Sequence, residues 1–180
     1  MCPPRLFSCA LRQVARQRMS PVCGRLLPVA LHGVLMKRDY PEHPIIGVGA
    51  VIISGGRVLL VRRNTEPLRG EWSVPGGMLE LGETLRDGLR REVLEETGIE
   101  VQPGEVLDVF DSIFTDTLGR TQYHYVLIDY LCRPVAGEAR AGSDVSDVRW
   151  VGAEALPAIG LRDSLEQVVR KGLLRATKMG

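Results

Sequence analysis

Runs of apolar and β-branched residues, separated by glycine-containing turns, divide much of this chain into expected strands. Runs of this length and composition are typical of buried β-strands. The expected strands cover residues 45–53, 57–63, 106–114, 121–131 and 148–151. Ser54-Gly55-Gly56 and Leu118-Gly119-Arg120 have the composition of hairpin turns, so we expect them to join neighbouring strands.

Two other segments repeat their apolar residues at helical spacing. Residues 161–174 place apolar side chains on one face, which predicts a closing helix packed on the sheet, and Pro157 breaks the chain ahead of it. The second helix follows Gly76-Gly77 and a turn. Thr84 can cap its start, because the hydroxyl accepts a bond from a free backbone N–H of the first turn. Gly98 ends it, since glycine adopts the left-handed conformation at little cost.

The inward face of this second helix changes from leucine to carboxylate. Leu85 and Leu89 start the core side. At about 100° per residue, Glu92 and Glu96 fall on the same side and Glu95 lies at its edge. Carboxylates at this spacing repel one another, and burying one unpaired is costly. A bound hard cation such as Mg²⁺ removes both problems.

A solvated acidic helix end, paired with Arg90 and Arg91, is the other interpretation of these glutamates. The residues around them favour the cation. Gly77, five residues, Glu83, seven residues and then residues 91–99 resemble a complete Nudix box, with every fixed position matched. The resemblance implies a hydrolase that cleaves a nucleoside diphosphate linked to another group, using Mg²⁺ or Mn²⁺. It also implies an α/β/α sandwich around a mixed β-sheet, and the expected elements from residue 45 to 174 are compatible with it.

The resemblance also implies roles for residues of the box. Glu92, Glu95 and Glu96 would hold the cation, and the carbonyl of Gly76 would add a ligand. Gly77 lacks a side chain, so its backbone can approach a phosphate closely. We expect an ion pair between Glu83 and Arg91 that fixes the helix against its loop.

The general base has two candidates. In some family members the counterpart of Glu92 is proposed for this role, and in others an acid in a later loop. Here that acid is Asp144, with Asp147 as second choice. The usual residue in the loop is glutamate, and aspartate reaches one methylene less far.

Arg62 and Arg63 stand at the end of an expected strand. The guanidinium fork matches phosphate oxygens, so these arginines are candidate substrate ligands. A solvated strand end is the alternative interpretation.

Composition bounds the location and the partners. The formal charge is +1, so bulk charge predicts neither nucleic-acid nor membrane binding, and we expect a small-molecule nucleotide as partner. The four cysteines show no C-x-x-C spacing, which predicts reduced thiols in a reducing compartment, the cytoplasm. Family members are often dimers, and residues 45–53 are our candidate interface strand.

Residues 1–38 are basic and contain no acid, in contrast to the domain expected over 39–180. Three interpretations stay open: a disordered arm, an organellar transit peptide that would make the location mitochondrial, and a misassigned start ahead of Met36.

The substrate is less determined than the family. We expect ADP-ribose or a similar nucleotide sugar, although the proline that ADP-ribose pyrophosphatases often carry about sixteen residues beyond the box is missing from Ser112-Ile113-Phe114-Thr115. The second hypothesis is a MutT-like hydrolysis of ordinary or oxidised nucleoside triphosphates. A third, from another class, is a regulator that only binds nucleotide; such domains often lose a box glutamate, and this chain keeps all of them.

Overall fold

The computed structural model describes residues 38–142 and 144–179 of the chain. These residues belong to one compact unit, Met36–Gly180. The basic extension expected at 1–38 lies outside the described residues except for Arg38, and so do Cys2, Cys9 and Cys23. Cys132 is described: it is a buried free thiol, and burial raises its pKa to about 12.

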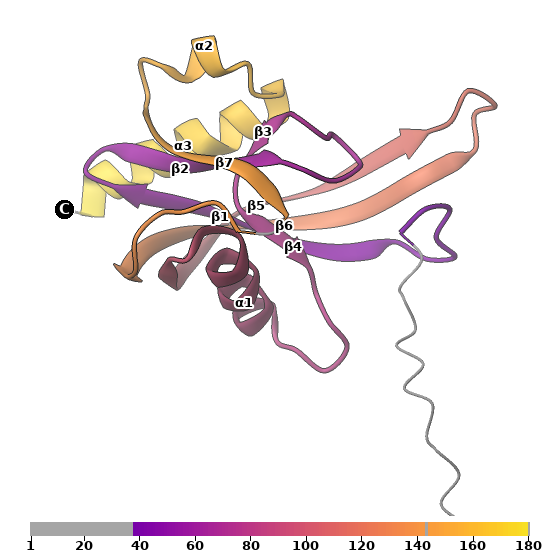
Figure 1. Ribbon diagram of the computed structural model, residues 1–180, viewed down its shortest axis with the longest axis horizontal. Helices are drawn as coiled ribbons and strands as arrows, with labels where there is room; N and C mark the ends of the chain where they lie inside the picture. Colours follow the sequence, from indigo (N-terminus) through magenta and orange to yellow (C-terminus); the bar gives the residue numbers. More distant parts are fainter. Residues whose placement is uncertain (1–37, 143, 180) are drawn as a thin grey trace, which may run out of the picture. The chain divides into compact units, whose positions relative to one another are not determined.

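A seven-stranded mixed sheet forms the centre of this unit (Figure 1). Its strands are β1 (Ile45–Ser54), β2 (Arg57–Arg63), β3 (Trp72–Ser73), β4 (Gly76–Met78), β5 (Glu100–Thr115), β6 (Thr121–Ala136) and β7 (Val145–Gly152). The order is β3-β2-β1-β6-β5, with β4 paired to β1 and β7 paired to β2. The β1–β6 pair is parallel and the other pairs are antiparallel.

All five expected strands are present, and the later three are longer than the sequence pattern indicates. β5 begins at Glu100 because irregularities in its pairing with β6 accommodate Pro103 and Gly104 within the strand. The far end of the β5–β6 hairpin extends beyond the rest of the sheet (Figure 1).

Helices cover both faces of the sheet. α1 (Leu85–Thr97) packs on one face and α3 (Asp163–Met179) on the other, while α2 (Leu156–Ile159) is short (Figure 1). Side chains alternate along each strand, so β1 sends Val48, Ala50 and Ile52 to the α1 core and Val51 to the α3 core. The expected α/β/α sandwich around a mixed sheet is confirmed.

The ends of α1 also agree with the sequence. Thr84 accepts a hydrogen bond from the backbone N–H of Asp87 at 3.2 Å. Gly98 follows the helix in the left-handed conformation, with φ of 68°. These two residues fix where the glutamates of α1 stand relative to the sheet.

One expectation needs correction. Pro157 does not break the chain; it stands in the first turn of α2, where a proline lacks only an N–H that the helix does not use. The backbone of β1 already pairs with β6 along one side and with β4 and β2 along the other, so β1 is not an edge strand. A dimer interface at β1 stays a prediction, and it would have to use side chains such as Ile46, which is exposed.

Among the helices of the described residues, none has the length and apolar content required to cross a bilayer.

Candidate active site

A pocket of about 320 Å³ is lined by residues of α1, of strands β1 to β6 and of the start of α3. Its lining holds both charged and apolar side chains. The charged ones are Arg38, Arg63, Glu92, Glu96, Asp111, Asp129, Asp144 and Arg162. The apolar ones include Val74, Phe110, Leu127 and Leu165. A lining of both kinds suits a ligand that carries anionic groups and a flat apolar group.

Two contacts join α1 to the glycines of β4, and the first is between Gly76 and Glu96. The backbone N–H of Gly76 donates to Oε2 of Glu96 at 2.9 Å. Glu96 is 9% exposed, and burial is the main reason why its pKa is raised to about 7. Only glycine fits at position 76, because φ is 150° and a β-carbon there would lie 2.1 Å from the carbonyl oxygen of Val48.

The second contact joins Gly77 and Glu92. A β-carbon on Gly77 would lie 2.3 Å from the carboxyl carbon of Glu92, so the carboxylate occupies the space that a side chain at 77 would need. Burial also raises the pKa of Glu92, against the opposing effect of the Arg91 guanidinium. The two glycines therefore hold two carboxylates against the backbone of β4.

Glu95 is placed differently from its two neighbours. Its side chain is 59% exposed and lies 3.4 Å from Arg91, outside the pocket lining. No three acidic, histidine or cysteine side chains of the described residues form a ready-made metal group. The pair Glu92 and Glu96 still fits a hard cation, because Mg²⁺ takes oxygen ligands, keeps several waters and binds few protein carboxylates.

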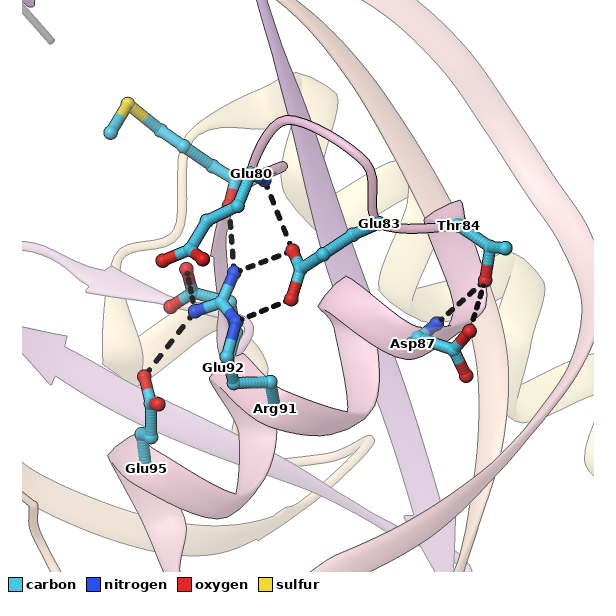
Figure 2. Close-up of polar contacts among 8 residues, drawn as sticks. Glu80, Glu83, Thr84, Asp87, Arg91, Glu92 and Glu95 are labelled. Carbon is cyan, nitrogen blue, oxygen red and sulfur yellow. Dashed lines mark hydrogen bonds and ion pairs between the residues drawn. The ribbon is translucent and has the colours of Figure 1, made fainter. Parts of the chain in front are cut away.

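Arg91 connects the helix, the preceding loop and Glu92 (Figure 2). Its Nε and Nη2 donate to the two oxygens of Glu83 at 2.8 and 2.9 Å. Nη1 donates to Glu92 at 2.9 Å, and Nη2 also reaches the carbonyl oxygen of Met78 at 3.2 Å. The hydrogen bond from Arg91 lowers the pKa of Glu83 to about 2, so this pair stays ionised. The expected Glu83–Arg91 pair is present, and it also orients one oxygen of Glu92.

The two arginines at the end of β2 have different surroundings. Arg63 lines the pocket, and its positive charge opposes the rise in the pKa of Glu96. Arg62 lies outside the lining and donates to the carbonyl oxygen of Gly70 at 2.9 Å. Arg38, which the sequence placed in the N-terminal extension, also lines the pocket.

Of the two loop acids, Asp144 and Asp147, only the first lines the pocket. Asp144 is exposed and lines the pocket, and its charge adds to the rise in the pKa of Glu96. Asp147 lies outside the lining, and it accepts hydrogen bonds from Arg149 and from the backbone N–H of Val148.

Sequence reasoning did not single out Asp129, which also lines the pocket. It lies on β6 with only 3% of its surface exposed. Among the described residues its Oδ2 has no hydrogen-bond partner. One signal was available in the sequence: this aspartate interrupts the apolar run Val126-Leu127-Ile128-Asp129-Tyr130-Leu131. Such a run is typical of a strand buried on both faces, where a charged side chain is unfavourable.

Comparisons with known proteins show which family this chain is similar to. A family model described as NUDIX domain matches residues 43–172. A protein of Methanocaldococcus jannaschii named ADP-ribose pyrophosphatase is 28% identical over 149 residues, which cover 77% of this chain and 86% of that protein. A MutT-like protein of Streptomyces ambofaciens is 34% identical over 133 residues, covering 70% and 79%. The solved MutT NUDIX hydrolase of Burkholderia pseudomallei has a TM-score of 0.63 at 30% identity, covering 72% of this chain and 98% of that one.

Proposed function

Because the chain belongs to the Nudix family of hydrolases, we propose that it cleaves the pyrophosphate bond of a nucleoside diphosphate linked to another moiety, with the help of a divalent cation. One observation carries the proposal: Glu92 and Glu96 are held side by side against the two glycines of β4 in the lining of the pocket. A pyrophosphate carries concentrated negative charge, so the task of such a site is to neutralise it and to position the attacking water.

Glu92 and Glu96 would hold the cation, with Glu95 at the rim and the carbonyl of Gly76 as a further oxygen ligand. When bound, Mg²⁺ or Mn²⁺ neutralises phosphate charge and lowers the pKa of water. The raised pKa values of the two carboxyls support this assignment, since buried carboxyls without a cation favour the proton. Gly77 leaves room for a phosphate oxygen close to the backbone.

Water attacks phosphorus, the bond from phosphorus to the bridging oxygen breaks, and a base takes the proton of the water. We assign the base to Glu92, because Arg91 binds its Oε1 and fixes the orientation of the carboxylate. Asp144 is the second candidate, since it also lines the pocket. The two are distinguished by the acidic limb of the pH–rate profile, which should be lost in Glu92→Gln and kept in Asp144→Asn.

Arg63 is our candidate for the substrate phosphates, because its side chain is half-buried in the pocket lining and its Nε is fixed by the carbonyl oxygen of Pro67 at 3.1 Å. Arg62 would act only at longer range, since its Nε is bound to Gly70 outside the lining.

ADP-ribose or a similar nucleotide sugar is the substrate that we favour. Two observations support it: the relative named ADP-ribose pyrophosphatase aligns over most of both chains, and the apolar side chains of the pocket lining suit a base. Hydrolysis of a nucleoside triphosphate is the second candidate, supported by the more identical relative named MutT-like protein.

The test is chromatographic identification of the products formed from ADP-ribose, other nucleotide sugars, NADH, diadenosine polyphosphates and nucleoside triphosphates. Release of AMP and ribose 5-phosphate from ADP-ribose, at a higher kcat/KM than any other substrate, is the expected result. A higher kcat/KM for triphosphates, with pyrophosphate as co-product, would move the chain to the second candidate. Tight nucleotide binding with no turnover would contradict both.

A further inference from the structure

Asp129 stands in a row of residues that crosses the sheet at the pocket. In the parallel β1–β6 pair it lies beside Gly49, and Gly49 lies beside Gly76 in the β1–β4 pair. A β-carbon on Gly49 would lie 2.1 Å from Oδ1 of Asp129, so the absent side chain of Gly49 makes room for the carboxyl group. The row thus connects the glycine that binds Glu96 to a second buried acid.

The carboxyl group of Asp129 is on the α3 face of the sheet. Leu131, two residues further along β6, belongs to the α3 core, and alternate residues of a strand share a face. Leu127 shares that face and lines the pocket with Asp129. Asp129 lies close to Val74 at Gly49, and it lines the pocket together with Val74, Phe110 and Leu165.

Nothing described in the protein compensates for the burial of this acid. Oδ2 has no hydrogen-bond partner among the described residues. The charged side chain that acts on Asp129 is Asp108 on β5, which has the same sign. Burial first, and Asp108 second, raise the pKa of Asp129 to about 7. A buried polar group without a partner is costly, and a leucine or valine here would cost less.

A neutral carboxyl group has one O–H donor and a carbonyl acceptor. This pair matches a ligand edge on which an amino group stands beside a ring nitrogen that accepts a hydrogen bond. Adenine has such an edge. Its two faces are flat and apolar, so they can pack against the apolar side chains of Val74, Phe110 and Leu165.

We infer that Asp129 determines base selectivity: its carboxyl group hydrogen-bonds the amino and ring-nitrogen edge of adenine in the pocket. The inference rests on the proposed function for the choice of a nucleotide as ligand.

The experiment measures binding of two ligands by calorimetry to the full chain. AMP carries the amino group, and purine riboside monophosphate is the same molecule without it. The wild type should bind AMP roughly tenfold more tightly, the size of effect expected for a hydrogen bond to a buried polar group. In Asp129→Leu the two affinities should agree within about twofold, and AMP should bind more weakly than to the wild type. Asp129→Asn keeps a donor and an acceptor of the same shape, so it should keep the preference.

Asp163→Asn is the matched control, because it removes a carboxylate that is exposed, outside the pocket lining and not among the charges that act on Asp129. It should leave both affinities unchanged. A structural role is distinguished by thermal unfolding: Asp129→Leu without ligand should unfold at the same temperature as the wild type or higher, since it removes an unpartnered buried acid. Equal binding of the two ligands by the wild type, or a preference for AMP retained by Asp129→Leu, would overturn the inference. So would a lost preference in Asp129→Asn.

The two proposals fail in different ways. If the proposed function fails, the wild type releases no AMP from ADP-ribose, whatever its base preference in binding. If only the inference fails, the wild type cleaves ADP-ribose and binds the two monophosphates equally.

Discussion

The backbone N–H of Gly76 donates to Oε2 of Glu96 at 2.9 Å, across 20 residues of sequence. This bond joins β4 to the last turn of α1. It satisfies one oxygen of a carboxylate that is otherwise buried beside a second carboxylate, Glu92. The fold holds the two carboxylates close together, and their mutual repulsion is unfavourable. A bound cation would remove this repulsion.

Glu96→Gln should reduce kcat by at least about 100-fold, the scale of removing one electrostatic contact in an active site. The amide can still accept the Gly76 N–H, so the urea midpoint of unfolding should not fall. Glu95→Gln is the matched control: its side chain is exposed, so a smaller loss is expected. Near wild-type turnover of Glu96→Gln at saturating Mg²⁺ would rule out the assignment.

Gly77→Ala should reduce kcat because the new methyl group would displace the carboxylate of Glu92. Gly119→Asn in the β5–β6 turn is a suitable control, since Gly119 has φ of 75° and no atom within 4 Å of a β-carbon. Steady-state kinetics on both variants checks the prediction. Unchanged kcat in Gly77→Ala would show that the position of Glu92 is not critical.

Arg91→Lys should lower the free energy of unfolding by about 1 to 3 kcal/mol, because a lysine cannot keep the paired bonds to Glu83. It should also lower kcat, since Glu92 loses its bond from Nη1. Arg90→Lys is the control: its pair with Asp87 is exposed, and such pairs contribute little. Urea unfolding curves of the two variants should differ clearly, and equal midpoints would contradict the role of Arg91.

Without cation or nucleotide, the protein should become less stable as the pH rises from about 4 to about 7. The pKa of Asp129 is raised from 3.8 to about 7, so in this range the folded state holds a proton that the unfolded state has released. The loss from this group is on the order of 2 to 4 kcal/mol. Glu96 contributes in the same direction.

Unfolding by urea in chelator, at several pH values, measures this loss. Asp129→Leu should show a smaller decline than the wild type, because Glu92 and Glu96 are then the only carboxyl groups of the described residues whose pKa is raised. An identical decline in the two proteins would contradict the raised pKa of Asp129.

The sequence predicted the caps of α1, the pair Glu83 and Arg91, and the inward side of Glu92 and Glu96 because all of these are local to one helix and its loop. Helical spacing alone relates such residues. The same spacing left Glu95 at the edge, and the structure shows it exposed.

The rest depends on pairing between distant strands, which periodicity does not determine. Arg62 and Arg63 are neighbours in sequence, yet only Arg63 lines the pocket, and the pairing of β2 with β7 shifts register between the two. Asp129 approaches Gly49 only through the parallel β1–β6 pair. A charged residue inside an apolar strand sequence identifies a candidate such as Asp129. Its position in the pocket can be predicted only when the neighbouring strand is known.

The central claim is that this pocket hydrolyses a pyrophosphate with a cation bound by Glu92 and Glu96. The initial rate of AMP release from ADP-ribose, measured against Mg²⁺ concentration for the wild type and for Glu92→Gln with Glu96→Gln, tests it most directly. We expect no release in chelator, saturable release by the wild type, and none from the double variant at any Mg²⁺ concentration. Release by the wild type in chelator, or by the double variant at a wild-type rate, would contradict the account.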